Sequence, residues 1–116
     1  MKRDWEIIRS ILIAAENMPV GGNLNSNDMK EFDVYVIAEH MRMLNDAGYV
    51  DARTVGLQNP TSILLRVNMS GYDLLHTIRS DTLWNKIKST AKDKGVELTF
   101  DVIKAIGAVI LPQMLG

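Results

Sequence analysis

Residues 37–50, Ile-Ala-Glu-His-Met-Arg-Met-Leu-Asn-Asp-Ala-Gly-Tyr-Val, join a helix pattern to a strand pattern through one glycine. Apolar residues recur at helical spacing in the first part of this stretch, so they predict one buried helix face. These residues are Ile37, Met41, Leu44 and Ala47. Gly48 follows the last turn, where glycine readily takes the left-handed conformation that ends many helices. The stretch therefore predicts a helix over residues 34–47 that passes directly into a strand.

The order of helix, glycine and strand resembles the third helix and first wing strand of bacterial winged-helix regulators. Those proteins commonly carry the pattern His-x-x-x-Leu-x-x-Ala-Gly-(Leu/Tyr)-Val. The matching residues here are His40, Leu44, Ala47, Gly48, Tyr49 and Val50. The resemblance implies a recognition helix followed by a β-hairpin wing. An ordinary amphipathic helix before a strand is the alternative interpretation.

The flanking sequence predicts further elements around this helix. A first helix is expected over residues 4–17, and residues 20–33 are polar enough to predict a loop with no more than one short helical turn. A standard helix-turn-helix has a well-formed second helix at this point, so the loop is a departure from that pattern. Residues 50–55 and 63–67 predict the two strands of the wing.

Three more helices are predicted in the second half of the chain. The first begins at Gly71 with Ser70 as its cap, and the second spans residues 81–94. The third follows Thr99, which we expect to cap it, and Pro112 should end or kink it near residue 111.

Four motifs, in this order, resemble a small bacterial and prophage family of unknown function. They are Met1-Lys2-Arg3-Asp4, His40-x-x-x-Leu44-x-x-Ala47-Gly48, Gly71-x-x-Leu74-Leu75-x-x-Ile78-Arg79 and Trp84-x-Lys86. The family usually has Leu-Thr where this sequence has Met69-Ser70. The resemblance implies no catalytic residues. It implies a mainly α fold with a small β-hairpin, in a single domain whose winged-helix-like core spans residues 1–69 and whose helical extension spans residues 70–116.

Composition narrows the functional classes. With 116 residues, of which 47% are hydrophobic, the chain is long enough to bury one core. It has no cysteine, which excludes disulfides and thiolate metal sites and makes a cytoplasmic location the expectation. Its apolar runs are too short to cross a membrane. The net charge of −1 disfavours a dedicated DNA-binding protein, because neutralisation of phosphates supplies most non-specific affinity.

The chain offers few residues for catalysis or metal binding. His40 and His76 are the two histidines, and neither has a carboxylate or a second histidine at metal-ligand spacing. Phosphate-binding loops and nucleophile elbows are absent from the sequence. We therefore expect no metal, no cofactor and no enzymatic activity. A serine or aspartate that meets His76 in space is the alternative that a sequence leaves open.

Two non-enzymatic functions fit the chain. The first is a winged-helix protein that binds double-stranded DNA, as a prophage or bacterial transcriptional regulator. Its predicted DNA contacts are Tyr35, Glu39, Arg42, Asn45, Arg53 and Arg66. The second is a protein–protein interaction module on the same scaffold, which charge favours because Glu39 and Asp46 accompany Arg42 and would repel phosphates. A continuous basic stripe over the helix, the wing and Lys2-Arg3 would favour DNA.

The helix over residues 81–94 has a basic side. Its lysines are Lys86, Lys88, Lys92 and Lys94. A lysine-rich helix side is usually just solvated, but this one is also the most plausible phosphate-facing patch outside the wing.

The last helix carries an apolar band that we expect a domain of this size to leave partly uncovered. The band consists of Phe100, Ile103, Ile106, Val109 and Ile110, with Met114 at its end. Gly107 and Ala108 are small enough to let another helix approach closely. We expect this band either to pack on the first helix through Trp5 and Ile8 or to form a homodimer interface.

Overall fold

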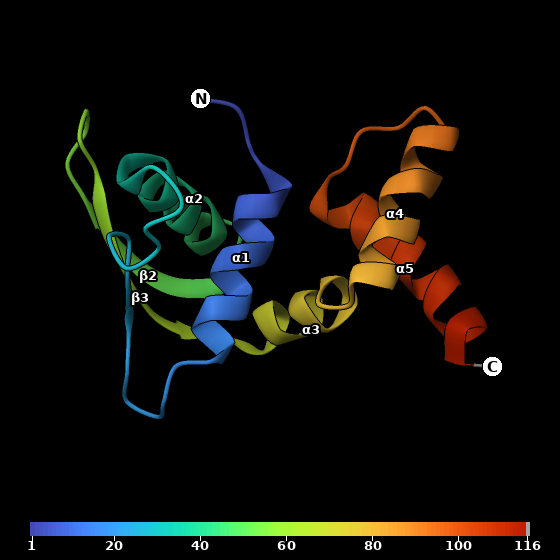
Figure 1. Ribbon diagram of the computed structural model, residues 1–116, viewed down its shortest axis with the longest axis horizontal. Helices are drawn as coiled ribbons and strands as arrows, with labels where there is room; N and C mark the ends of the chain where they lie inside the picture. Colours follow the sequence, from blue (N-terminus) through green and yellow to red (C-terminus); the bar gives the residue numbers. More distant parts are fainter. Residues whose placement is uncertain (116) are drawn as a thin grey trace. The chain divides into compact units, whose positions relative to one another are not determined.

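The computed structural model describes residues 1–115, with side chains for residues 1–113. The described chain contains five helices and three short strands (Figure 1). The elements are α1 (Trp5–Glu16), β1 (Leu24–Asn25), α2 (Val34–Asp46), β2 (Val50–Val55), β3 (Thr61–Val67), α3 (Met69–Ile78), α4 (Asp81–Asp93) and α5 (Phe100–Leu115). The prediction of a mainly α fold with a small β-hairpin is confirmed.

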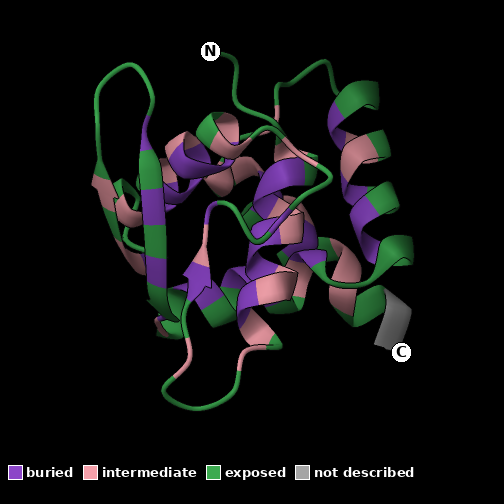
Figure 2. Ribbon diagram, turned by 60° about the vertical axis from the view of Figure 1, so that its left-hand side comes forward, coloured by how far each residue is buried: buried purple, intermediate pink, exposed green. Residues whose placement is uncertain are grey.

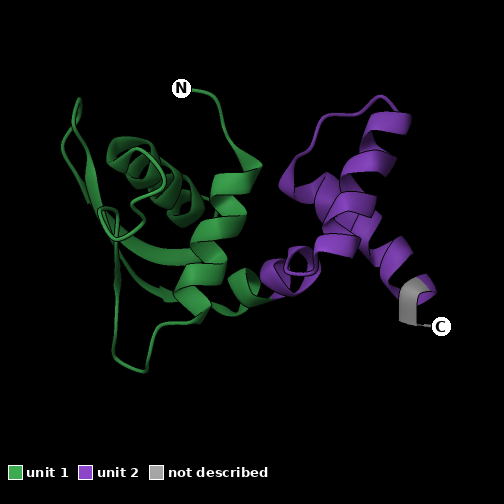
Figure 3. Cartoon of the chain, in the orientation of Figure 1, with its two compact units in different colours: residues 1–72 green, residues 73–116 purple. Residues whose placement is uncertain are grey.

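The chain forms two compact units, which we call unit 1 (residues 1–72) and unit 2 (residues 73–116) (Figure 3). The predicted division into a core of residues 1–69 and a helical extension of residues 70–116 lies close to this boundary. That the two parts form a single domain stays a prediction.

The core of unit 1 lies between two helices and the sheet. In α1 the Asp4 carboxylate accepts hydrogen bonds from the backbone N–H groups of Glu6 (2.9 Å) and Ile7 (3.4 Å), so Asp4 caps the helix. α1 packs on α2 and β3, and α2 packs on both long strands. The buried residues of the two helices lie on the faces turned toward the sheet and toward each other (Figure 2).

Both ends of α2 follow from local sequence, and Gly48 ends the helix as predicted. Asp33 caps its beginning by accepting hydrogen bonds from the N–H groups of Tyr35 (2.9 Å) and Val36 (3.2 Å). At its end Gly48 has φ +84°, and the Tyr49 N–H donates to the Leu44 carbonyl at 3.0 Å. The chain can therefore leave the helix and enter β2 within three residues.

The segment between α1 and α2 contains no helix but does contain a strand that the sequence did not predict. β1 has two residues, and it pairs antiparallel with β3 through Leu24 and Leu64, and through Asn25 and Ile63. The sheet order is β1-β3-β2. After β1 come two tight turns, closed by hydrogen bonds from Asp28 N–H to Asn25 and from Phe32 N–H to Met29. These turns take the place of a second helix.

A β-bulge shifts the register between β2 and β3. Asp51 pairs with Arg66, but the next residue, Ala52, pairs with Leu64, so β3 has Leu65 as an extra residue. The Ala52 N–H at this point donates to the Asn45 side-chain oxygen at 3.0 Å. β3 also begins at Thr61, two residues before the predicted start at residue 63.

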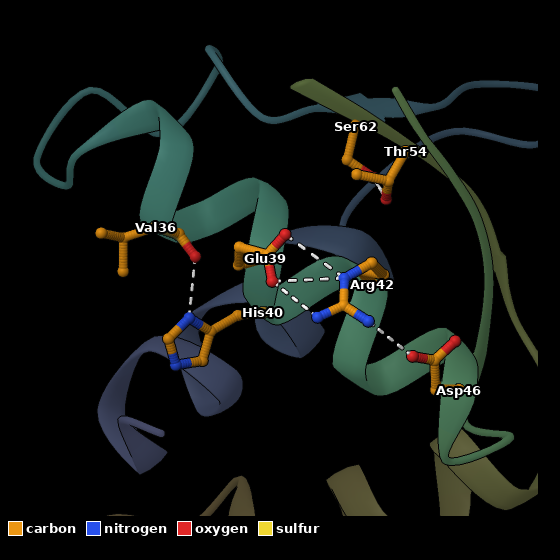
Figure 4. A network of polar contacts seen from close by, with 7 residues as sticks. All are labelled: Val36, Glu39, His40, Arg42, Asp46, Thr54 and Ser62. Atoms are coloured by element: carbon orange, nitrogen blue, oxygen red, sulfur yellow. Dashed lines mark hydrogen bonds and ion pairs between the residues drawn. The ribbon is translucent and has the colours of Figure 1, made fainter. Parts of the chain in front are cut away.

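Hydroxyl groups connect β2 and β3 with the residue that follows β1. The Ser62 N–H donates to the Ser26 hydroxyl oxygen at 3.0 Å, and the Ser62 hydroxyl donates to the Arg53 carbonyl at 3.1 Å. Thr54 is 3.0 Å from the Ser62 oxygen, and it must donate because the Ser62 hydroxyl hydrogen is already used (Figure 4). These contacts satisfy polar groups that burial would otherwise leave costly.

The start of α3 differs from the prediction. The helix begins at Met69 rather than Gly71, and its cap is Asn68 rather than Ser70. The Asn68 side-chain oxygen accepts a hydrogen bond from the Gly71 N–H at 3.0 Å, while its amide group donates to the Gly48 carbonyl at 2.8 Å. Asn68 can do both because its amide carries the acceptor oxygen and the donor N–H groups on separate atoms.

Unit 2 contains the two remaining predicted helices. Ser80 caps α4 through the Leu83 N–H, and Gly95, with φ +69°, follows its end. Thr99 caps α5 through the Val102 N–H at 3.1 Å. α5 does not end near residue 111, because the helix continues through Pro112. The other expected outcome, a kink at Pro112, stays a prediction. Pro112 is exposed in the last turns of the helix. Proline has no backbone N–H, so the carbonyl four residues earlier lacks its helical hydrogen bond, and water can bind that carbonyl instead.

The first prediction concerns Gly71, where α3 passes close to the end of α2. A Cβ at this position would overlap the Tyr49 carbonyl oxygen and the Val67 side chain. We expect Gly71→Ala to lower the free energy of unfolding by about 1–3 kcal/mol, since backbone atoms cannot yield easily. Denaturant unfolding followed by circular dichroism measures this. Ser70→Ala, at the exposed neighbouring position, should change stability by no more than about 0.5 kcal/mol.

Candidate functional site

The fold brings three of the six predicted DNA contacts together. Asn45, Arg53 and Arg66 line one shallow groove where the end of α2 meets the wing. The other three predicted residues lie on α2. We call the whole region the α2–wing surface. It consists of Tyr35, Glu39, Arg42, Asn45, Asp46, Asp51, Arg53 and Arg66.

Arg42 is held between two carboxylates on the same helix. Its guanidinium lies 2.6 Å from a Glu39 oxygen and 2.9 Å from an Asp46 oxygen (Figure 4). The hydrogen bond from Arg42 lowers the pKa of Glu39, so Glu39 is ionised at neutral pH. Because Arg42 is the one lysine or arginine of α2, this exposed side of the helix has more acidic than basic charge.

The basic residues of the wing are not equivalent. Arg66 forms an ion pair with Asp51, its cross-strand neighbour. Arg53 is exposed, and its guanidinium forms no ion pair with any described residue. The Asn45 side-chain oxygen accepts a hydrogen bond from the Ala52 N–H, and the Asn45 amide N–H groups form no hydrogen bond with a described residue, so they are available to a partner.

Unit 1 therefore presents no continuous basic stripe across α2 and the wing within its described residues. It contains nine acidic and seven basic side chains in total. At the N-terminus the Arg3 guanidinium lies over the Trp5 ring, 4.5 Å from its centre. The arrangement lacks the electrostatic pattern that would favour DNA.

Apolar residues on the wing are a feature that the sequence reasoning missed. Val55 and Leu57 are 69% and 99% exposed, and Ile63 and Leu65 are about 40% exposed. The sequence could not reveal these exposed residues, because the apolar run before Val67 does not show which of its side chains face outward. The bulge decides this, since it turns Leu65 away from the core.

The two histidines have different surroundings. His40 is fully buried, where its Nε2 accepts a hydrogen bond from the Asp4 N–H at 2.9 Å and its Nδ1 lies 2.8 Å from the Val36 carbonyl. This geometry assigns the proton to Nδ1. His76 is exposed and makes no hydrogen bond with a described residue. Over the described chain, no group of three or more histidine and acidic side chains could hold a metal ion.

The structure divides the predicted dimer band of α5. Ile103 is fully buried, and Gly107 faces Thr77 and Ile87 of the same unit rather than a second copy. Ile103 is therefore a core residue that was wrongly placed in an interface. Phe100, Ile106 and Ile110 are half-buried and Val109 is exposed, so a dimer through these four stays a prediction. The Met114 side chain lies outside the described residues.

Comparisons with known proteins identify a family and a relative of this chain. Residues 2–97 match the family model described as "Hypothetical protein (DUF2513)". The chain belongs to this family. It is also 37% identical to an "Uncharacterized protein" of Haemophilus influenzae, over the full length of both chains. No solved structure matches it. The resemblance to a small family of unknown function is thus confirmed, while the prophage setting and the winged-helix core stay predictions.

Within residues 1–115 none of the helices is both long and apolar enough to cross a bilayer.

The second prediction assigns His40 to stability. His40→Ala should lower the free energy of unfolding by about 2–4 kcal/mol, because it leaves a cavity and removes the acceptor of the Asp4 N–H. His76→Ala is the matched control and should stay within about 0.5 kcal/mol of the wild type. Thermal and denaturant unfolding of both variants provides the comparison. Equal effects would show that the buried hydrogen bonds contribute nothing measurable.

Proposed function

We propose that this chain is a non-enzymatic protein–protein interaction module with a winged-helix-like core, and that its α2–wing surface binds the partner. The observation that carries the proposal is the pairing of Arg42 with Glu39 and Asp46. A phosphate that approached Arg42 would have to displace two carboxylates, and both would repel it. A protein surface can accept the paired charges as they are.

The element order supports the winged-helix-like part of the proposal. A helix followed directly by a β-hairpin, with a short strand completing the sheet beside β3, is the arrangement expected of such a core. The missing second helix supports a role other than standard DNA recognition. In a helix-turn-helix that helix crosses the DNA backbone and braces the recognition helix, and here two tight turns stand in its place.

The chemistry of the surface is that of a protein interface. Tyr35 is 41% exposed, and aromatic and arginine side chains are enriched at such interfaces. The exposed wing residues Val55, Leu57 and Leu65 add apolar area that nucleic-acid phosphates cannot use. Together these residues fit a partner protein whose surface is partly apolar and carries few unpaired charges.

Double-stranded DNA is the second candidate partner, and one observation favours it. Arg53 is exposed and unpaired among the described residues, and it shares a groove with the free amide group of Asn45. Arginine and asparagine are residues that read base edges in DNA. In this case the chain would act as the regulator that the sequence suggested.

The third prediction separates the two candidates. If α2 and the wing bind protein, Arg42→Ala and Arg53→Ala should leave the affinity of the full chain for duplex DNA unchanged within twofold over a salt series. If they bind DNA, Arg42→Ala should cost about 1–3 kcal/mol of specific affinity, and Arg53→Ala should weaken binding to all sequences. Fluorescence anisotropy with genomic-neighbourhood and random duplexes gives both numbers. The DNA pattern would overturn the proposal.

The fourth prediction tests protein binding directly. A photo-crosslinking residue placed at Tyr35 or Leu57 should yield a protein adduct of defined mass in cells, whereas the same residue at exposed Lys30 should not. Leu57→Asp should abolish the adduct formed from position 35, because it places a charge within the apolar part of the surface. Adducts with nucleic acid alone, or equal adducts from all three positions, would contradict the proposed interface.

A further inference from the structure

Three lysines without an ion pair to a described residue lie close together in sequence along α4 and at its C-terminal cap, in unit 2. Lys86 and Lys92 are exposed on the helix and Lys94 is exposed at its C-terminal cap. None of these three forms an ion pair with a described residue. Lys88 differs, because its amine lies over the Trp84 ring, 5.4 Å from the centre. The segment from Ser80 to Lys94 contains four lysines and two aspartates, so it carries an excess of positive charge.

We propose that the exposed side of α4 is a contact surface for the phosphate backbone of a nucleic acid. This inference does not rest on the protein-binding role of the α2–wing surface, which lies in the other unit. It starts from charge complementarity. Two of the three arginines of α2 and the wing are neutralised by neighbouring acids, whereas Lys86 and Lys92 of α4 and Lys94 at its C-terminal cap form no ion pair with a described residue and are available to a polyanion.

Polar groups beside the lysines fit the same ligand. Thr82, Asn85 and Ser89 are exposed, and their helical spacing places them on one side of α4 together with Lys86 and Lys92. Hydroxyl and amide groups are common donors to phosphate oxygens. Asn85, Lys86, Ser89 and Thr90 also line a groove between α4 and α5. A strand of nucleic acid would therefore meet both charge and hydrogen-bond donors.

The spacing suits a backbone rather than a single anion. Lys86 and Lys92 are six residues apart, which corresponds to about 9 Å along a helix. One strand of B-DNA presents roughly two or three phosphates over that length. Stabilisation of the helix C-terminus explains lysines in the last turn, but it does not explain Lys86 in the middle of the helix.

A membrane surface fits less well. Helices that lie on bilayers insert an apolar side between the lipids. The apolar side of α4 is already used within the protein, because Leu83, Trp84, Ile87 and Ala91 are all buried. The side that remains exposed is polar, as the phosphate backbone of a nucleic acid requires.

The fifth prediction tests this surface with a 20-base-pair duplex of mixed sequence. The full chain should bind it at 50 mM salt and weaken steeply by 200 mM. Lys86→Gln, Lys92→Gln and Lys94→Gln combined should reduce affinity at least tenfold and lower the salt slope by about 2–3. The control removes three lysines elsewhere, through Lys2→Gln, Lys30→Gln and Lys104→Gln, and should stay within about threefold of wild type. Anisotropy measures all three proteins.

Other outcomes decide against the proposal. No binding by the wild type at 50 mM salt, or equal losses in the two triple variants, would overturn it. Loss only with Arg42→Ala or Arg53→Ala would assign DNA to the α2–wing surface instead. Tighter binding to phosphatidylserine vesicles than to the duplex, dependent on the same lysines, would assign a membrane. If the triple variant loses its helical circular dichroism, Ser89→Glu replaces it, and it should weaken duplex binding at least fivefold.

Discussion

The β-bulge at Leu65 is the constraint on which unit 1 depends. Without it, strict alternation would place Leu65 and Val67 on the same side of the sheet. With the extra residue, Leu64 and Val67 are both buried, and Leu65 and Arg66 both face outward. The buried pair supplies the floor on which α1 and α2 pack. The outward pair lines the groove at the α2–wing surface. Ala52 and Asn45 line it as well, and the Ala52 N–H donates a hydrogen bond to the Asn45 side-chain oxygen.

The distribution of charge depends on where each unit places its arginines and lysines relative to its acidic residues. In α2 the spacing of Glu39, Arg42 and Asp46 closes two ion pairs along one helix side. Across the hairpin the register places Asp51 beside Arg66. In α4 the lysines have no such acidic neighbours at matching positions. The chain as a whole is almost neutral, but its two units would present different surfaces to a charged partner.

Local signals in the sequence predicted the helices well. Gly48 and Thr99 act where the sequence analysis placed them, and Asp33 and Ser80 cap helices in the same local way, because capping depends on residues within one turn. The pairing of Arg42 is readable for the same reason, since the partners are three and four residues away. These parts of the candidate site follow from neighbours along the chain.

Features that depend on distant segments could not be predicted. β1 is a strand only because Leu64 lies beside Leu24, and Asn68 becomes a cap because it can also reach the Gly48 carbonyl. Asp51 neutralises Arg66 only in the shifted register. Ile103 looked like part of an exposed band, yet it is buried in unit 2. In each case the deciding neighbour is far away in sequence, so no local pattern contains it.

The two tryptophans are divided between the units, which gives each unit its own optical probe. Trp5 is half-buried in unit 1 beneath the Arg3 guanidinium, whereas Trp84 is 2% exposed in unit 2. A buried indole emits at shorter wavelength than one in contact with water, so the two contributions differ in colour. Replacing either ring by phenylalanine leaves a single emitter. Spectroscopy can then follow the melting of each half of the molecule separately, without an added label.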